Sequence, residues 1–173
     1  MIWFWYFMLY SFLGFLLEIF YARLTGGHPQ RKCLLLLPVC PVYGLGACAI
    51  VGILSLNLST PVLFLCGMFL ATAAEYCTAL FYESILKVAF WDYSHLPCNL
   101  HGRVCLPFSL IWGILSIPLV RWLHPVVASF PGFLPTSLGL CLLLTFLCDC
   151  LVSALLLRRH RHRDCLNWYR SLA

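Results

Sequence analysis

Long apolar runs separated by short polar connections dominate the first 157 residues of the chain. A helix needs about 20 predominantly apolar residues to cross the hydrocarbon core of a bilayer. Five runs reach that length, and each is expected to form a membrane-spanning helix. They are Ile2–Tyr21, Leu34–Leu56, Pro61–Leu86, Val104–Leu123 and Thr136–Leu157. The pattern therefore predicts an all-α, polytopic transmembrane helix bundle of about five spans.

The second run differs from the others because Pro38, Pro41, Gly44 and Gly46 stand near its start. Proline lacks a backbone N–H and clashes with the preceding turn of a helix. Irregular backbone at membrane depth is tolerated only against protein or beside a wet cavity. We therefore predict that this segment is broken at Pro38/Pro41. A re-entrant second segment, which would leave four spans, is the alternative.

The positions of Lys and Arg predict the orientation, because cytoplasmic connections are enriched in these residues. The connection 23–33 holds three, the connection 87–103 holds two and the tail holds five, which makes ten of the eleven. The other connections hold none, although Arg121 stands just before one of them. With five spans, this alternation places the N-terminus outside and the C-terminus in the cytoplasm.

The composition supports lipid as the surrounding solvent. Hydrophobic residues make up 62% of the chain and charged residues only 10%, whereas a soluble domain carries about 25% charged residues. The mean hydropathy is +0.93. We therefore divide the chain into a transmembrane helical domain, residues 1–157, and a basic cytoplasmic tail, residues 158–173. The net charge of +5 does not indicate a nucleic-acid partner, because the basic residues flank the apolar runs.

The eleven cysteines raise the question of a disulfide or metal framework. Most of them lie inside apolar runs, where cysteine behaves as a small hydrophobe. No Cys-x-x-Cys pair occurs, and the other Cys and His groupings lack a usual zinc-ligand spacing. We expect neither a metal nor a cofactor. The cysteines inside apolar runs are Cys40, Cys48, Cys66, Cys77, Cys141, Cys148 and Cys150.

Four carboxylates interrupt the apolar runs: Glu18, Glu75, Glu83 and Asp149. Each costs roughly 2.5–3.5 kcal/mol at the bilayer centre, so such groups normally face the bundle interior and find partners. Glu75 and Asp149 lie deeper than the other two. Residues three or four apart share a helix face, and small or polar residues recur at that spacing around Glu18, Glu75 and Asp149. These acids either join helices by hydrogen bonds or line a pathway.

The connection 90–103 mixes aromatic and polar residues with one charge of each sign. Trp91 and Tyr93 suit the headgroup interface, and Asp92 is expected to pair with Arg103 or Arg31. A simple interfacial loop with aromatic anchors is the alternative to a role in a site.

Several short motifs follow one another in an order that resembles a known family. They are Tyr10-Ser11-Phe12-Leu13-Gly14 with Glu18, Pro38-x-Cys40-Pro41-x-Tyr43-Gly44-x-Gly46-Ala47, Glu75-Tyr76, Trp91-Asp92-Tyr93-Ser94, Asn99-Leu100-x-Gly102-Arg103, and Ser109 with Trp112-Gly113. Together they resemble the bacterial proteins described as putative ABC-transporter type IV permeases, the CmpB-like proteins, over roughly residues 9–125. The resemblance implies a multipass protein of the bacterial cell membrane with a role in transport. Leu37 and Cys98 depart from the residues common in the family.

We therefore expect a permease-type subunit with a polar cavity on the cytoplasmic side. No Gly-x4-Gly-Lys-Ser/Thr motif for a nucleotide occurs in the sequence, so any ATPase is a separate partner. Membrane lipids and a second copy or a partner subunit are the other expected contacts. The residues expected to line the cavity are Glu18, Tyr21, Arg31, Tyr43, Glu75, Glu83, Asp92, Tyr93, Asn99, Arg103 and Asp149.

Two other functions remain open. The first is a membrane-embedded enzyme acting on a lipid or lipid-linked substrate, with Glu18, Glu75, Asp92, Tyr93 and Arg103 as acid, base and anion-binding groups. The absence of a recognisable nucleophile or metal motif in the sequence disfavours an enzyme. The second is a small membrane scaffold or sensor in which the buried acids only join helices.

Overall fold

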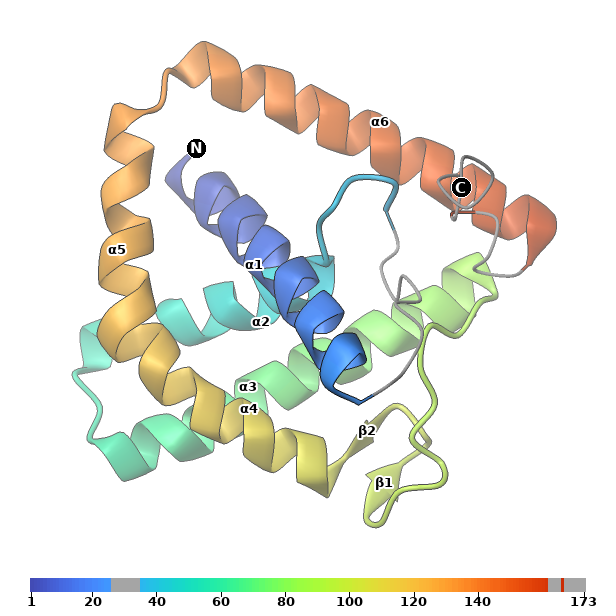
Figure 1. The fold of residues 1–173 in the computed structure, drawn as a ribbon, viewed down its shortest axis with the longest axis horizontal. Helices are drawn as coiled ribbons and strands as arrows, with labels where there is room; N and C mark the ends of the chain where they lie inside the picture. Colours follow the sequence, from blue (N-terminus) through green and yellow to red (C-terminus); the bar gives the residue numbers. More distant parts are fainter. Residues whose placement is uncertain (26–34, 162–165, 167–173) are drawn as a thin grey trace.

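A computed structural model describes residues 1–25, 35–161 and 166 of the chain. Helices make up most of this part, and one small hairpin accompanies them (Figure 1). The α-helices are α1 (Ile2–Leu24), α2 (Pro41–Val51), α3 (Thr60–Phe81), α4 (Leu106–Pro118), α5 (His124–Ser129) and α6 (Thr136–His160). Strands β1 (Asn99–Leu100) and β2 (Val104–Cys105) pair antiparallel, with Asn99 opposite Cys105.

Within the described ranges, four continuous helical stretches are long and apolar enough to cross a membrane. They are Ile2–Leu24, Thr60–Leu86, Leu106–Phe133 and Thr136–His160. The prediction of an all-α bundle is confirmed. The stretch Leu106–Phe133 extends ten residues beyond the Leu123 boundary expected from the sequence, because Leu119–Leu123 continues the helical path as a π-helical turn. The chain bends there (Figure 1), as it commonly does at proline residues and π-bulges.

The second apolar run is broken as predicted. Helix α2 starts at Pro41, and Cys40 before it is extended, with φ −112° and ψ 96°. Proline fits the first helical turn because the N–H that it lacks has no partner there. The resulting helix of 11 residues is about 16 Å long at 1.5 Å per residue. It is thus shorter than the roughly 30 Å hydrocarbon core.

Glycine residues allow α1 and α2 to approach closely. A Cβ added at Gly14 would overlap the side chain of Tyr43, and one added at Gly44 would overlap Ser11 and Phe7. Glycine also allows α3 and α4 to pack closely, because Gly67 lies against the side chain of Ser116. Close backbone approach of this kind is typical of helices that pack within membranes.

The packing pairs define the directions of the helices. In α3 and α4, Thr72 bonds to Ser109 whereas Leu63 accepts from Ser116, so these helices are antiparallel. Helix α2 lies between α1 and α3 and runs opposite to α3, since Gly46 lies near Ala71 and Ile50 packs with Leu63.

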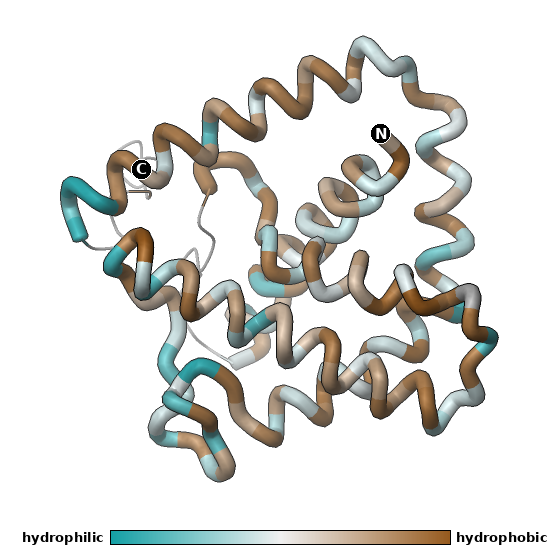
Figure 2. Tube along the Cα trace, turned by 180° about the vertical axis from the view of Figure 1, so that it is seen from behind, coloured by the Kyte–Doolittle hydropathy of each residue, from teal (hydrophilic) through white to brown (hydrophobic). Residues whose placement is uncertain are grey.

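Helix α6 runs along the side of the bundle, parallel to α1 (Figure 1). It contacts α1 along its first half and the end of α3 near its own end. Gly139 lies against Trp5 near the start of α1, and Phe146 meets the ring of Phe7 at 5.5 Å. Near its end, Leu157 joins a cluster with Phe90 and the end of α3. Figure 2 shows apolar residues along the length of α6 and hydrophilic residues at its basic end. Its exposed leucines are suited to contact with lipid.

The ends of α1, α3 and α6 and the start of α4 lie on one side of the molecule (Figure 1). Six of the seven Lys and Arg residues in the described part of the chain belong to these ends: Arg23, Lys87, Arg103, Arg158, Arg159 and Arg161. The seventh, Arg121, lies at the opposite end, where its Nη2 donates to the Leu58 carbonyl oxygen at 3.4 Å.

Cys40 is an exception to the interpretation of the cysteines as small hydrophobes, because it is disulfide-bonded. Cys48, Cys66, Cys77 and Cys150 are free thiols, as are the other cysteines described outside Cys40. The prediction that the cysteines in apolar runs are unpaired is thus confirmed for those thiols and wrong for Cys40.

Candidate functional site

Glu75 is at the centre of a cluster of polar side chains in the middle of the protein. This residue belongs to α3, and it is only 4% exposed. Its Oε1 accepts a hydrogen bond from the Tyr93 hydroxyl at 3.0 Å, and its Oε2 accepts one from Trp112 Nε1 at 2.9 Å. One donor comes from the connection after α3 and the other from α4, so the carboxylate joins segments that are distant in the sequence.

Helices α1 and α2 add a second acid to this cluster. The Tyr43 hydroxyl donates to Glu18 Oε1 at 2.6 Å. The Tyr43 ring meets the edge of Trp112, with 5.3 Å between ring centroids, which connects the Glu18 pair to the Glu75 pair. Gly14 provides the space for this tyrosine. We call Glu18, Tyr43, Glu75, Tyr93 and Trp112 the central cluster.

The connection between α3 and α4 is folded so that it holds Tyr93 in place. The Tyr93 ring stacks on Phe108 with centroids 4.9 Å apart, and its backbone N–H donates to the Gly102 carbonyl at 2.7 Å. Burial, together with the adjacent Glu75 carboxylate, raises the pKa of Tyr93 above its usual range. The hydroxyl is therefore a donor at neutral pH. Tyr21 also meets Phe108, edge to face, with 6.5 Å between ring centroids.

Asp92 and Asn99 shape the turn rather than face the central cluster. Asp92 Oδ1 accepts from the Ser94 backbone N–H at 2.8 Å, and these hydrogen bonds hold the pKa of the Asp92 carboxyl below its usual value. Asn99 Nδ2 donates to the Leu96 carbonyl at 2.9 Å. Gly102 has φ +69°, and a Cβ there would also meet Asp92 Oδ1, so glycine is required.

Arg103 forms a separate ion pair beside the central cluster. Its Nη2 lies 2.6 Å from Glu83 Oε2, and its Nη1 donates to the Tyr76 hydroxyl at 3.1 Å. The same guanidinium lies over the Tyr76 ring, 5.3 Å from its centroid. The hydrogen bonds to Glu83 raise the pKa of Arg103. The expected partner Asp92 is instead engaged by Ser94.

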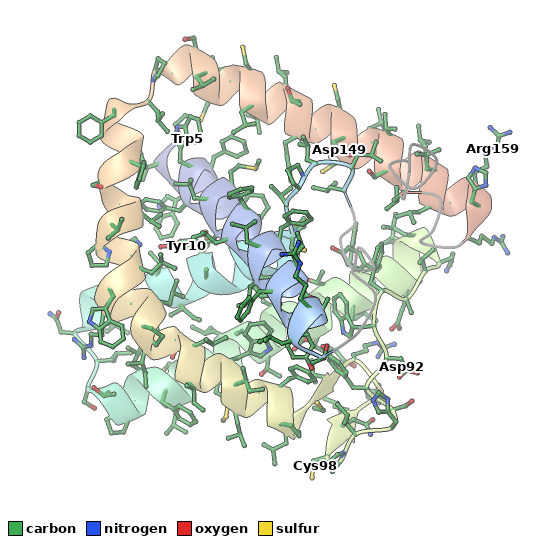
Figure 3. The ribbon with its side chains drawn as sticks, viewed as in Figure 1. Trp5, Tyr10, Asp92, Cys98, Asp149 and Arg159 are labelled. Carbon is green, nitrogen blue, oxygen red and sulfur yellow. The ribbon has the colours of Figure 1, made fainter. Side chains whose placement is uncertain are left out.

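Asp149 belongs to a different part of the fold. It is 8% exposed, and its carboxylate accepts from the backbone N–H groups of Leu36 and Leu37 at 2.9 and 2.7 Å and from Ser153 Oγ at 2.8 Å. Figure 3 shows it on α6, apart from Asp92 and the hairpin. Its partners explain why an acid stands there, because they include the backbone donors of the non-helical segment before α2.

A cavity of about 550 Å³ lies between α1, α2, α3 and α4 and the turn that follows α4. Its walls are largely apolar, whereas the sequence led us to expect a polar cavity. Glu75, Tyr43 and Trp112 bring the central cluster into the wall, and Tyr10 and Trp122 also line it.

Tyr10 connects the cavity to His124. The Tyr10 hydroxyl lies 2.7 Å from His124 Nδ1, and the ring of His124 packs against Tyr6 at 5.2 Å. Sequence reasoning missed Tyr10, Trp112 and His124 as site residues. The Trp112-Gly113 motif could have indicated Trp112, because a buried tryptophan N–H requires an acceptor and the apolar runs contain few acidic side chains that could accept.

The predicted site residues thus fall into separate groups. One group converges in the central cluster and consists of Glu18, Tyr43, Glu75 and Tyr93. Tyr21 contacts Phe108 beside this cluster. The turn nearby contains Asp92 and Asn99. Glu83 and Arg103 pair with each other, and Asp149 lies elsewhere. Arg31 lies outside the described residues. Within the described ranges, no group of three or more His, Cys, Asp or Glu side chains is arranged to hold a metal.

Apolar helices of membrane-spanning length, packed through glycine around a buried acidic cluster, define an integral membrane protein. The model of the family described as putative ABC-transporter type IV matches residues 5–154, and the chain belongs to this family. No curated protein and no solved structure matches the chain. The family match extends at both ends beyond the range expected from the sequence motifs.

Proposed function

We propose that this chain is a permease-type subunit of a membrane transporter, and that the cavity between α1 and α4 holds the transported molecule. The observation that carries the proposal is the Glu75 carboxylate in the wall of a 550 Å³ cavity. Burying an acid in a membrane protein is costly, and acids placed there commonly mark a substrate or ion pathway. Membership of an ABC-transporter-type family supports the same conclusion.

The direction of the helices supports a multipass arrangement in a bacterial cell membrane. Helix α2 runs opposite to α3, and the basic ends lie together, so the chain alternates between two sides. We propose that the basic side is cytoplasmic, in keeping with the enrichment of Lys and Arg there. The N-terminus is then outside, and the hairpin and the end of α6 face the cytoplasm.

We propose that the energy for transport comes from a separate ATPase, because the sequence holds no nucleotide-binding P-loop. A second copy or a partner subunit completes the pathway. The sparse contacts of α6 with the rest of the bundle leave much of that helix available for such a subunit.

The test uses inside-out membrane vesicles from cells that express the full chain with its native partners, incubated with a cell extract. Vesicle contents are compared by mass spectrometry with and without ATP. We expect ATP-dependent accumulation of particular solutes in vesicles with the wild-type chain and a loss of that accumulation with Glu75→Gln. Glu83→Gln makes the same chemical change outside the cavity and controls for altered insertion. Identical solute profiles in vesicles with and without the chain would refute a transport role.

A further inference from the structure

We propose that the cavity binds a lipophilic organic cation, with Glu75 as its counter-charge. This inference rests on the proposed function for its context, but it concerns binding and can be tested without transport. A volume of about 550 Å³ falls within the range of about 300–1,000 Å³ that is typical of pockets for small organic ligands. The cavity is therefore large enough for a multi-ring molecule.

The apolar walls select for an apolar ligand body. Residues such as Leu13, Leu17, Ile50 and Leu115 supply most of the lining. A sugar or a phosphate would lose its hydration in such a place without regaining the hydrogen bonds, which is unfavourable. An apolar molecule gains from the same surface by leaving water.

The charge of the cavity selects for a positive ligand. Glu75 is its only acidic lining residue in the described part of the chain, and no Lys, Arg or His accompanies it in the lining. The described partners of its carboxylate are the neutral donors Tyr93 and Trp112, so neither of them supplies a positive charge. Arg103 does not supply the missing charge, because it is engaged by Glu83.

Aromatic rings strengthen this preference. Tyr10, Tyr43, Trp112 and Trp122 all line the cavity. Aromatic faces attract cations, and tryptophan is the most favourable of them. Glu18, held by Tyr43 at 2.6 Å, places a second carboxyl group next to the wall. One acid with several aromatic rings in an apolar space matches a delocalised or hindered organic cation.

The experiment measures binding of radiolabelled tetraphenylphosphonium to the purified full chain in detergent, with ethidium as a second cation of different shape. Radiolabelled tetraphenylborate, which has the same shape and the opposite charge, is measured in a separate sample as the control. We expect saturable binding of at least one cation, no saturable binding of the borate, and a loss of at least tenfold in affinity with Glu75→Gln. Glu83→Gln should change the affinity by less than about twofold, which is below 0.5 kcal/mol.

A second variant guards against misfolding of Glu75→Gln. Leu115→Trp fills the cavity without changing its charge, and should also abolish cation binding while the protein remains monodisperse. The proposal is overturned if neither cation binds, if the borate binds with equal affinity, or if Glu75→Gln binds the cations with wild-type affinity. Cation binding without solute flux would instead refute transport alone, whereas chain-dependent flux without cation binding would refute only this inference.

Discussion

The carboxylate of Asp149 should contribute measurably to stability, because it holds the broken segment before α2 against α6. Its two oxygens accept three hydrogen bonds, from the backbone N–H groups of Leu36 and Leu37 and from the Ser153 hydroxyl. Hydrogen bonds to a charged group contribute about 1.5–3 kcal/mol each, and a buried donor left without an acceptor costs about 1–3 kcal/mol.

In Asp149→Asn, the amide oxygen can replace Oδ1, which accepts from Leu36 and Ser153. The amide NH₂ then faces the N–H of Leu37, so one charged hydrogen bond is lost and two donors oppose each other. We expect a loss of about 2–3 kcal/mol in the free energy of unfolding. Ser153→Ala removes a single donor and should cost only about 1–1.5 kcal/mol.

The assay is reversible unfolding of the detergent-solubilised protein with increasing SDS, followed by tryptophan fluorescence. Asp149→Asn, Ser153→Ala and the wild type are compared under identical conditions, with Thr145→Val on the exposed face of α6 as the control. If Asp149→Asn unfolds within 0.5 kcal/mol of the wild type, the carboxylate does not hold the segment and the reasoning fails.

Three further predictions follow from other parts of the molecule. Gly67→Val places a branched side chain against Ser116 and should cost about 1–3 kcal/mol, whereas Gly132→Ala, which has open space, should leave the thermal midpoint unchanged in detergent. The pKa of Asp92 lies below its ordinary value of 3.8 in the folded protein, so its contribution to stability is complete above that value and disappears as pH falls through the lowered folded pKa. The difference in unfolding free energy between wild type and Asp92→Asn should therefore be present at pH 7 and vanish near pH 2; a constant difference would contradict the role of the Ser94 hydrogen bonds. Alkaline phosphatase should be active in cells when inserted after Gly132 and inactive when fused to the C-terminus, and the reverse pattern would invert the proposed orientation.

The main features of the fold follow from the apolar pattern because lipid imposes two simple requirements, length and internal backbone hydrogen bonding. The break before α2 was predictable from Pro38 and Pro41, since proline acts through its own backbone. The continuation of the fourth predicted run past Leu123 was not, because Pro125 suggests an end there, whereas the chain continues through a π-helical turn into α5. Sequence alone does not say whether a proline ends a helix or kinks it.

The candidate site was only partly predictable, because hydrogen-bond partners come from distant segments. The spacing placed Glu75 on an inward face, but did not show that Tyr93 and Trp112 would be its donors, 18 and 37 residues away. The charges suggested a pair between Asp92 and either Arg103 or Arg31. The hairpin instead directs Arg103 to Glu83, 20 residues earlier at the end of the α3 stretch.

Glu75 and Asp149 show what a structure adds to the interpretation of a buried acid. Both lie deep in apolar runs, both are nearly inaccessible, and small or polar residues accompany both along their helices, so the sequence treats them alike. Their surroundings differ in kind. Asp149 accepts from backbone donors that a broken helix leaves without partners, and this need explains its charge completely. Glu75 accepts from the Tyr93 and Trp112 side chains rather than from backbone groups, and it faces a cavity. A buried acid beside a space of ligand size is the one to which a function should be assigned first.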